Sequence, residues 1–282
     1  MKKQNIIFCD GGLANRLNSL IGGLKLAEII KGEWIICWPI NEWCGSALED
    51  LFNVDLPIIN EKLSFFQEKI EGFFFIMHED QLNFKPKMHI NVNAITSFEC
   101  LNLTSELNYF YYNNLIPKFL SIKDISDMLK LISVNHKIKE KASNFIKKYN
   151  ICNDTIGLHI RKTDFGDLVN DEELFKLALE SESVFFVCTD DPVVSKKFSK
   201  LKNCNVYLHA DYVEKRDDNL NWNDLVSDNV GRLYNFNVAR NSESVSAALI
   251  DLLILSKTKI VNTSHSTFLK MAITFKQINY ID

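Results

Sequence analysis

The sequence lacks any uninterrupted run of about 18 apolar residues, so no transmembrane helix is predicted. Its opening stretch, MKKQNIIFCDGG, leads directly into a strand-like segment that is too short for a secretion signal. Lysines and arginines form no dense cluster, and the formal net charge is −4, so no nucleic-acid partner is expected. These absences favour a cytoplasmic protein, and they leave open both peripheral attachment to a membrane and the oligomeric state.

Several short motifs are also missing. The sequence has no GxGxxG loop and no GK[ST] sequence, which disfavours a dehydrogenase and a P-loop kinase or sulfotransferase. It contains no DxD triplet. The cysteines are odd in number and form no CxxC pair, so we expect reduced thiols in place of a disulfide framework or zinc site. The seven cysteines are Cys9, Cys37, Cys44, Cys100, Cys152, Cys188 and Cys204.

What is present is an ordinary globular composition with alternating strand and helix patterns. With 282 residues, the chain is predicted to form two α/β lobes, residues 1–150 and 151–282, each with a Rossmann-like, doubly wound sheet. Residues 41–115 give no readable order of elements, and residues 117–149 look like a helical bridge. The expected strands are 5–9, 33–38, 155–160, 184–189, 205–208, 259–262 and 277–281, and the expected helices are 16–31, 171–179, 192–200, 242–255 and a short one from 266.

A polar loop, Asp10 to Arg16, follows the first predicted strand. The paired glycines Gly11 and Gly12 let a ligand approach the backbone, and the helix N-terminus behind them suits an anion. Asn15 and Arg16 add polar and cationic groups to the same loop. Glycines also suit the geometry of a tight turn, so this loop alone allows a functional or a structural interpretation.

A second polar loop, HIRKTD, follows the strand predicted at residues 155–160. Alternate side chains along a strand face the same way, so His159 and Arg161 are expected on one side of the sheet. A guanidinium suits a diphosphate, and an imidazole can bond a base or a sugar. Lys162 is a further cation expected to bind the nucleotide. The alternative for this loop is a structural histidine and a surface pair of Arg161 with Asp164.

Two more strand ends carry polar groups. In CTDDP, either Asp190 or Asp191 suffices to cap the following helix, which leaves the other to bind ribose or guanine. Two adjacent carboxylates are too few for a hard cation, so no metal site is predicted. In NTSHSTF, the hydroxyls of Ser264, Ser266 and Thr267 either form a phosphate site or cap a helix.

Together these four segments resemble the fucosyltransferase superfamily, which includes α1,2-, α1,6- and protein O-fucosyltransferases. Its members share a glycine-rich GGxGNR or GGxGNQ loop, an HxRRxD motif, a TDD-type strand end and a Ser/Thr-rich segment near the C-terminus. This chain has GGLANR, HIRKTD, CTDDP and NTSHSTF in that order over nearly its whole length. Two positions differ from the pattern, because Lys162 replaces the second arginine and Ala14 replaces a glycine.

The resemblance implies a GT-B fold, with two lobes facing a central cleft, and an inverting transfer of fucose from GDP-fucose to a glycan in polysaccharide biosynthesis. It also implies that no metal or other cofactor is needed. His159 and one of Asp190 and Asp191 would contact guanine, and Arg161 the β-phosphate. The glycine loop, through Asn15 and Arg16, would face the donor from the other lobe, and the hydroxyls of the NTSHSTF segment would lie near the diphosphate.

The reaction would be a displacement at the anomeric carbon by an acceptor hydroxyl, with Arg161 stabilising the departing GDP. Asp10, Asp164 and Glu42 are the candidate general bases, and the sequence does not choose among them. Asp251, within an apolar stretch, is interpreted as a partnered structural acid. The alternatives are a transferase of the same fold that uses GDP-heptose or GDP-mannose, and a non-catalytic protein that binds a nucleotide or a glycan.

Overall fold

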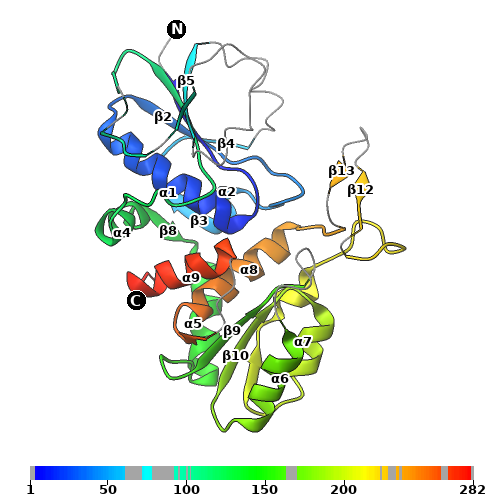
Figure 1. Cartoon of the computed structure of the whole chain (residues 1–282). Coiled ribbons are helices and arrows are strands. Elements are labelled where there is room, and N and C mark those ends of the chain that lie inside the picture. The colour runs from blue at the N-terminus through cyan, green and yellow to red at the C-terminus, as the bar shows by residue number, and fades with distance from the viewer. Residues whose placement is uncertain are drawn as a thin grey trace. The chain divides into compact units, whose positions relative to one another are not determined.

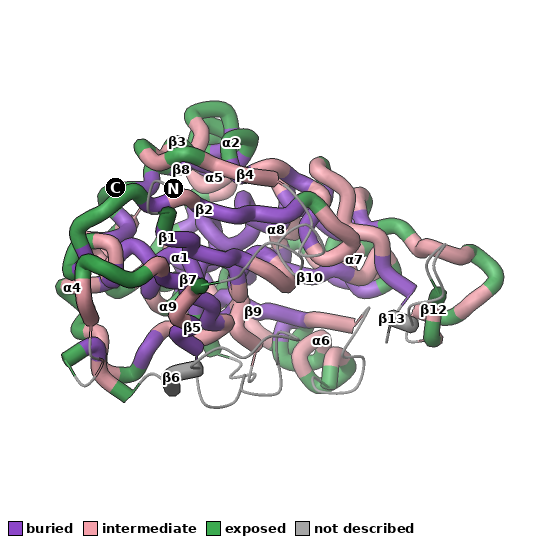
Figure 2. The backbone as a smooth tube through the Cα atoms, turned by 90° about the horizontal axis from the view of Figure 1, so that it is seen from above, coloured by how far each residue is buried: buried purple, intermediate pink, exposed green. Residues whose placement is uncertain are grey.

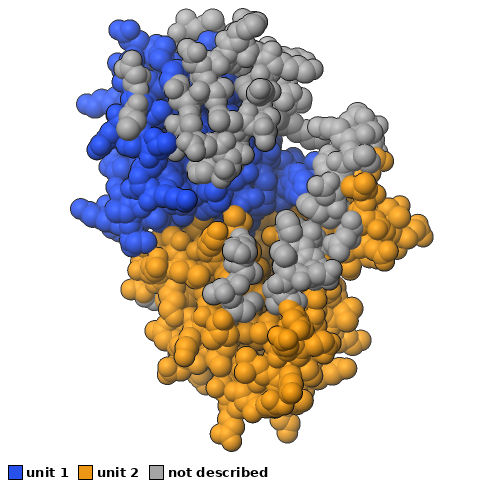
Figure 3. Space-filling model, in the orientation of Figure 1, with its two compact units in different colours: residues 1–135 blue, residues 136–282 orange. Residues whose placement is uncertain are grey.

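The computed structural model describes residues 4–60, 72–77, 92–94, 96–99, 101, 103–162, 170–222, 224–227, 233–234, 237–261 and 266–280. The chain divides into two compact units, Met1–Asn135 and His136–Asp282, coloured blue and orange in Figure 3. The structure divides between residues 135 and 136. The boundary predicted from the sequence was between residues 150 and 151. Helix α5 (His136–Tyr149) accordingly belongs to the second unit, where it packs against helix α8 (Ser242–Leu255).

The first unit is built on a six-stranded parallel sheet in the order β4-β2-β1-β7-β5-β6. A parallel sheet is normally covered on both faces, and this explains why its strands are continuous apolar runs in the sequence. In Figure 2 the neighbouring strands β1 and β2 are mostly buried. The strands are β1 (Gln4–Phe8), β2 (Glu33–Cys37), β4 (Ile58–Ile59), β5 (Phe73–Met77), β6 (Val92–Ala94) and β7 (Asn108–Tyr112).

Helix α1 (Leu13–Ile29) packs closely on one face of this sheet. Its two central glycines make the approach possible. A Cβ on Gly22 would lie 1.9 Å from the Tyr111 hydroxyl, and one on Gly23 would lie 2.3 Å from an Ile7 methyl carbon. The opposite face of the sheet carries an aromatic-rich cluster that includes Phe8, Phe75 and Phe110.

The remaining described elements of the first unit are short. Helix α4 (Ile122–Lys130) begins with a capping box, in which Ser121 and Asp124 each accept a hydrogen bond from the other's backbone N–H. Strand β8 (Ile132–Val134) interrupts the region predicted as helical. It pairs with β3 (Phe52–Val54), which follows helix α2 (Leu48–Leu51), in an antiparallel ribbon.

The second unit contains a four-stranded parallel sheet in the order β11-β10-β9-β14. Alternate side chains of β9 and β10 divide between its faces. Leu158 and Val187 pack with residues of α6 and α7, whereas Phe186 contacts Phe145 of α5 on the other face. Figure 1 shows α6 and α7 beside β10. The elements are β9 (Ile156–Ile160), α6 (Asp171–Glu180), β10 (Phe185–Thr189), α7 (Pro192–Phe198), β11 (Cys204–Val206), η2 (Leu208–Tyr212), β12 (Val226–Ser227), β13 (Leu233–Tyr234), α8, β14 (Lys259–Ile260) and α9 (Thr267–Gln277).

The strand predicted at residues 277–281 is wrong. Helix α9 runs to Gln277 and ends in a Schellman motif, with Asn279 in the left-handed region at φ 51°. The Tyr280 N–H donates to the Phe275 carbonyl at 3.1 Å, and the two rings are in contact, with centroids 4.4 Å apart and planes tilted by 37°. The predicted fold class, an α/β chain of two Rossmann-like units, is confirmed, whereas a central cleft between them stays a prediction.

Candidate functional site

The Asp10 loop lies at the carboxyl end of β1, beside a point where the strand order reverses. From β1 the chain first adds β2 on one side of the sheet, and β7 later pairs with β1 on the other side. Ligands of open α/β sheets bind at such switch points, outside the carboxyl ends of the strands. The sheet topology therefore places the predicted glycine loop where a ligand site is expected.

Gly11 and Gly12 have different roles in this loop. Gly11 has a φ of +81°, a left-handed conformation that a residue with a Cβ adopts at a cost. Gly12 has an extended backbone at the N-cap of α1, and a Cβ added there would meet no atom within 4 Å. Because α1 begins with no side-chain cap and no acidic residue in its first turn, its N-terminal N–H groups are suited to an anion or a ligand oxygen.

Arg16 is fully buried, and its guanidinium is held inside the loop. It donates from Nε to the Gly11 carbonyl at 2.7 Å, from Nη1 to the Pro39 carbonyl at 2.6 Å and from Nη2 to Asn41 Oδ1 at 2.8 Å. Its guanidinium carbon also lies 5.1 Å from the centre of the Trp38 ring. Through these contacts Arg16 supports the loop. Direct binding of a nucleotide-sugar by Arg16 stays a prediction.

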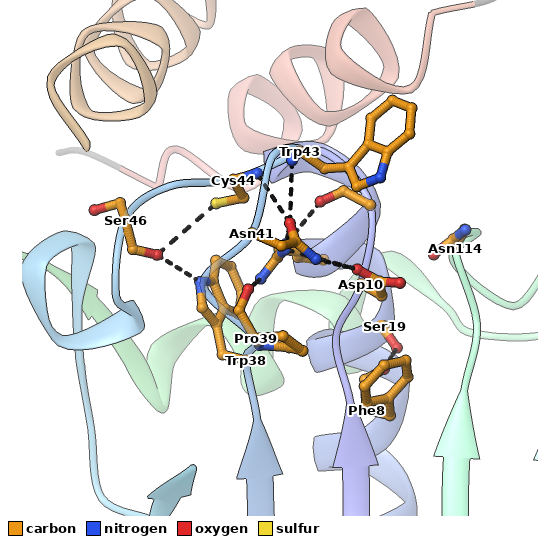
Figure 4. Close-up of polar contacts among 12 residues, drawn as sticks. Phe8, Asp10, Ser19, Trp38, Pro39, Asn41, Trp43, Cys44, Ser46 and Asn114 are labelled. Atoms are coloured by element: carbon orange, nitrogen blue, oxygen red, sulfur yellow. Dashed lines mark hydrogen bonds and ion pairs between the residues drawn. The ribbon is translucent and has the colours of Figure 1, made fainter. Parts of the chain in front are cut away.

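Asn41 joins Arg16 to Asp10. Figure 4 shows its bond to Asp10. Its Nδ2 donates to Asp10 Oδ1 at 2.9 Å, and its Oδ1 accepts from the backbone N–H groups of Trp43 and Cys44 as well as from Arg16. The same Asp10 oxygen lies 3.7 Å from Arg16 Nη2, and the carboxylate is 28% exposed. Asn41 was not predicted as a site residue. Its position just beyond the end of β2 is the signal that could have indicated it.

Asn15 and the end of β7 complete this edge of the first sheet. Asn15 Oδ1 is buried and has no hydrogen-bond partner among the residues that the structure describes. Ser19 links α1 to both central strands, because its hydroxyl donates to the Phe8 carbonyl at 2.6 Å and accepts from the Asn113 N–H at 3.2 Å. The Asn18 amide donates to the Asn114 carbonyl at 2.8 Å. Asn15 Oδ1 could therefore accept a hydrogen bond from the nucleotide-sugar, and this expected role stays a prediction.

In the second unit, β9 lies beside the corresponding switch point. Strand β10 follows β9 on one side, and β14 pairs with β9 on the other. His159 is buried near the end of β9, and its ring stacks on Phe268 with centroids 5.0 Å apart and planes 17° from parallel. Arg161 follows the strand directly, and its side chain is 28% exposed. The expected base contact of His159 stays untested, whereas Arg161 has the exposure that an anion-binding group needs.

Lys162 contributes its backbone to the site but holds its ammonium elsewhere. Its N–H donates to Asp190 Oδ1 at 2.9 Å, while its Nζ lies 2.7 Å from Asp171 Oδ1 in α6. Burial acts to raise the pKa of Asp171, but Lys162 and Lys197 outweigh it and lower that pKa. The ammonium of Lys162, which was predicted to bind the nucleotide, is therefore engaged in an ion pair within the chain.

Asp190 and Asp191 both have partners within the chain. Asp191 caps α7, because its Oδ1 accepts from the N–H groups of Val193 at 2.6 Å and Val194 at 3.1 Å. Asp190 is buried. Its Oδ2 lies 3.9 Å from Arg161 Nε and 3.7 Å from Arg240 Nη2. The guanine or ribose contact expected of one of these carboxylates stays a prediction.

Arg240 is the second residue that sequence analysis missed. It lies in the segment before α8, far in sequence from HIRKTD, and its side chain is 15% exposed. No motif surrounds it, and its membership of the site follows only from its ion pair with Asp190.

The Ser/Thr-rich segment is partly described. Ser266 occupies the N-cap of α9 and Thr267 begins the helix, which has no acidic residue in its first turn. The N-terminus of α9 is thus at the carboxyl side of β14, as the predicted phosphate role requires. Ser264 and Asp164 lie outside the described residues.

Asp251 of α8 lies in a buried polar cluster with His209 and Cys188. Its Oδ2 is 3.6 Å from His209 Nδ1, and both residues are nearly inaccessible. Burial raises the pKa of Asp251, an effect that His209 and Cys188 only partly offset, and burial also raises the pKa of the Cys188 thiol. The interpretation of Asp251 as a partnered structural acid agrees with this pairing.

Two further features concern the described part of the chain. No helix there is long and apolar enough to span a membrane, and no three histidine, cysteine or acidic side chains are grouped as metal ligands. The six cysteines within it are free thiols, five of them buried and Cys152 exposed.

The two units have the doubly wound architecture of nucleotide-binding α/β proteins. No protein-family model matches the sequence, and no curated protein matches it significantly. Among solved structures, NodZ α1,6-fucosyltransferase co-crystallised with GDP is similar, with a TM-score of 0.58 and 16% identity over 97% of this chain and 92% of that one. NodZ from Bradyrhizobium gives a TM-score of 0.57 at 15% identity, over 96% of this chain and 92% of that one. The chain therefore has the fold of a fucosyltransferase along nearly its whole length.

Proposed function

We propose that the chain is a glycosyltransferase that transfers fucose from GDP-fucose to a hydroxyl group of a glycan. The observation that carries this function is the position of Arg161, a partly exposed guanidinium beside the switch point of the second sheet. The shared fold supports the same donor, because a NodZ structure with the same 92% coverage and a TM-score of 0.57 was soaked with GDP-fucose.

In the proposed reaction an acceptor oxygen attacks the anomeric carbon of fucose as the bond from that carbon to the β-phosphate oxygen breaks. The configuration at the anomeric carbon inverts, and the electron pair of the broken bond leaves with GDP. Arg161 stabilises the charge that develops on the departing diphosphate, as a preorganised donor does. The guanidinium supplies the positive charge in this scheme, so we propose that no metal is required.

The proton of the acceptor hydroxyl passes to a carboxylate, and we propose Asp10 for this role. One of its oxygens is held by Asn41, and the carboxylate retains 28% exposure at the edge of the first sheet. For this reaction the Asp10 loop and the Arg161 site must face the same sugar, as they do in the expected two-lobed cleft. A cytoplasmic location and a role in polysaccharide biosynthesis complete the proposal.

The function is tested by measuring nucleotide release from a panel of donors. The purified protein is incubated with GDP-fucose, GDP-mannose, GDP-heptose or UDP-glucose, with EDTA present, and the released GDP or UDP is quantified. We expect release from GDP-fucose, by slow hydrolysis alone and faster with a suitable glycan. Release from another GDP-sugar only would correct the donor, and release only when a divalent cation is restored would contradict the metal-free mechanism.

A matched measurement separates a transferase from a protein that only binds. The unfolding temperature is recorded with GDP, UDP, CDP and NAD, because a ligand at 100 times its dissociation constant stabilises a fold by about 2.7 kcal/mol. Stabilisation by GDP without turnover of any donor would favour a binding protein, and no stabilisation by GDP would overturn the proposed function.

A further inference from the structure

Two arginines from distant parts of the second unit share one buried carboxylate. Arg161 Nε lies 3.9 Å and Arg240 Nη2 lies 3.7 Å from the same oxygen of Asp190. The Asp190 side chain is 6% exposed, whereas those of Arg161 and Arg240 are 28% and 15% exposed. The carboxylate is therefore the inner group of the cluster, and the guanidinium groups are closer to solvent.

The segment that carries Arg240 is fixed on both sides. Before it, the Ala239 N–H donates to the Glu214 carbonyl at 2.8 Å, and Arg216 Nε donates to the Val238 carbonyl at 2.9 Å. After it, Asn241 caps α8 by accepting from the Ser244 N–H at 2.8 Å. Arg240 is thus presented from an ordered backbone, as a binding residue must be to lose little entropy on binding.

The charge of this cluster suits an anion. Arg161, Arg240 and Asp190 together carry one net positive charge, and Arg240 directly precedes the N-terminus of the 14-residue helix α8. The positive end of a helix dipole disfavours a cation and favours an anion. Two planar guanidinium groups beside one carboxylate can also donate hydrogen bonds to the oxygens of a diphosphate.

Lys162 does not provide this second charge, because its ammonium is paired with Asp171. We propose that Arg240 is a second diphosphate-binding residue and that Asp190 is the positioning residue that orients both arginines. This inference rests on the proposed function, since it places the diphosphate of the GDP-sugar at Arg161. It gives Asp190 a role in orienting the cations in place of the guanine contact expected from the sequence.

The inference is tested by calorimetric titration of GDP and of guanosine into the wild type, Arg240→Gln and Asp190→Asn. Lys196→Gln is the control, because it removes one positive charge from an exposed position on α7. We expect Arg240→Gln to weaken GDP binding by about tenfold or more, equivalent to about 1.4 kcal/mol, and to leave guanosine binding unchanged. Lys196→Gln should bind both ligands as the wild type does. If Arg240→Gln does not fold, Arg240→Lys keeps the charge without the fork and should bind GDP with intermediate affinity.

Asp190→Asn separates positioning from base recognition. Its amide oxygen can still accept from the Lys162 N–H, so the fold should persist, while the arginines lose their common anion. We expect weaker GDP binding and a lower kcat for donor turnover, because both arginines lose their orientation, and unchanged guanosine affinity. Loss of guanosine affinity would show a base contact and overturn the positioning role.

A GDP affinity of Arg240→Gln within twofold of the wild type would overturn the role of Arg240 alone. No GDP binding by the wild type would overturn the proposed function itself.

Discussion

Asp10 shows how a loop carboxylate can be held in place and remain available to a ligand. One oxygen accepts from the Asn41 amide at 2.9 Å, and the buried guanidinium of Arg16 lies 3.7 Å from that same oxygen. Arg16 in turn is fixed by the backbone carbonyls of Gly11 and Pro39. A base whose orientation is set by neighbours transfers a proton without first searching for its geometry.

Substituting the candidate bases one at a time tests this assignment. We expect Asp10→Asn to lower kcat of fucosyl transfer by about 100-fold or more, because a general base contributes roughly that factor. GDP affinity should change little, because Asp10 is not proposed to bind the nucleotide. Glu42→Gln is the matched control, since Glu42 follows Asn41 directly and was an equal candidate from the sequence. A large loss of kcat in Glu42→Gln together with an active Asp10→Asn would reverse the assignment.

At the residue scale, the sequence indicated polar residues at strand ends but not the partners of those residues, and the functional roles of these residues stay predictions. Arg161 and the Asp10 loop were chosen as candidates because each follows an apolar strand, and His159 because it lies near the end of one. Arg240 and Asn41 were not identified, because each joins its cluster only through a tertiary contact with a carboxylate distant in sequence. The internal partners of Arg16 and Lys162 were not predicted for the same reason. The sequence around a cation does not show whether its side chain binds a ligand or an acceptor within the chain.

At the scale of elements, the predictable parts are the strands and helices with strong periodicity. Strands β1, β2, β9 and β10 and helices α1, α6 and α8 lie within a few residues of their predicted ranges. Strand β7, which pairs with β1 at the switch point, was not predicted because its sequence, NYFYY, lies in an aromatic stretch without alternation. The final predicted strand failed because Asn279 ends α9 in a left-handed conformation that apolar periodicity does not reveal.

Helix α8 carries a buried acid whose effect on stability depends on pH. Since burial raises the pKa of Asp251, the folded protein keeps a proton that the unfolded chain releases near the ordinary value of 3.8. Folded protein then binds more protons than unfolded protein between the two pKa values, so this group's contribution to stability falls as pH rises through that window. Above the folded-state pKa its contribution is constant.

Asp251→Asn should abolish this pH-dependent term. We expect the free energy of unfolding of the variant, relative to the wild type, to increase from pH 4 upward by about 1.4 kcal/mol for each unit by which burial raises the pKa. Urea denaturation at a series of pH values measures the difference. A difference that does not vary with pH would show that Asp251 ionises in the folded protein as it does in the unfolded chain.

At the scale of the whole molecule, two parallel sheets each place polar loops at the carboxyl ends of their strands beside a switch point. The composition and alternation predicted this architecture, and the similarity to NodZ over 97% of the chain agrees with it. The division at 135/136 was harder to place, because α5 is a Lys-rich amphipathic helix whose packing on α8 is a tertiary property. No sequence pattern predicts which acceptor the proposed transferase would use.

The central claim is that Arg161 holds the diphosphate of a GDP-sugar, and calorimetric titration of GDP into the wild type and Arg161→Ala tests it most directly. Loss of a preorganised charged donor of this kind costs about 3 to 4 kcal/mol in other sites, so we expect GDP affinity and fucosyl transfer to fall by about 100-fold or more. The variant should fold as the wild type does, because the Arg161 side chain is partly exposed and Arg240 remains beside the buried Asp190. It should bind guanosine with unchanged affinity, because the proposed ligand of Arg161 is the diphosphate and guanosine has none. Equal GDP affinity of Arg161→Ala and the wild type would contradict the account.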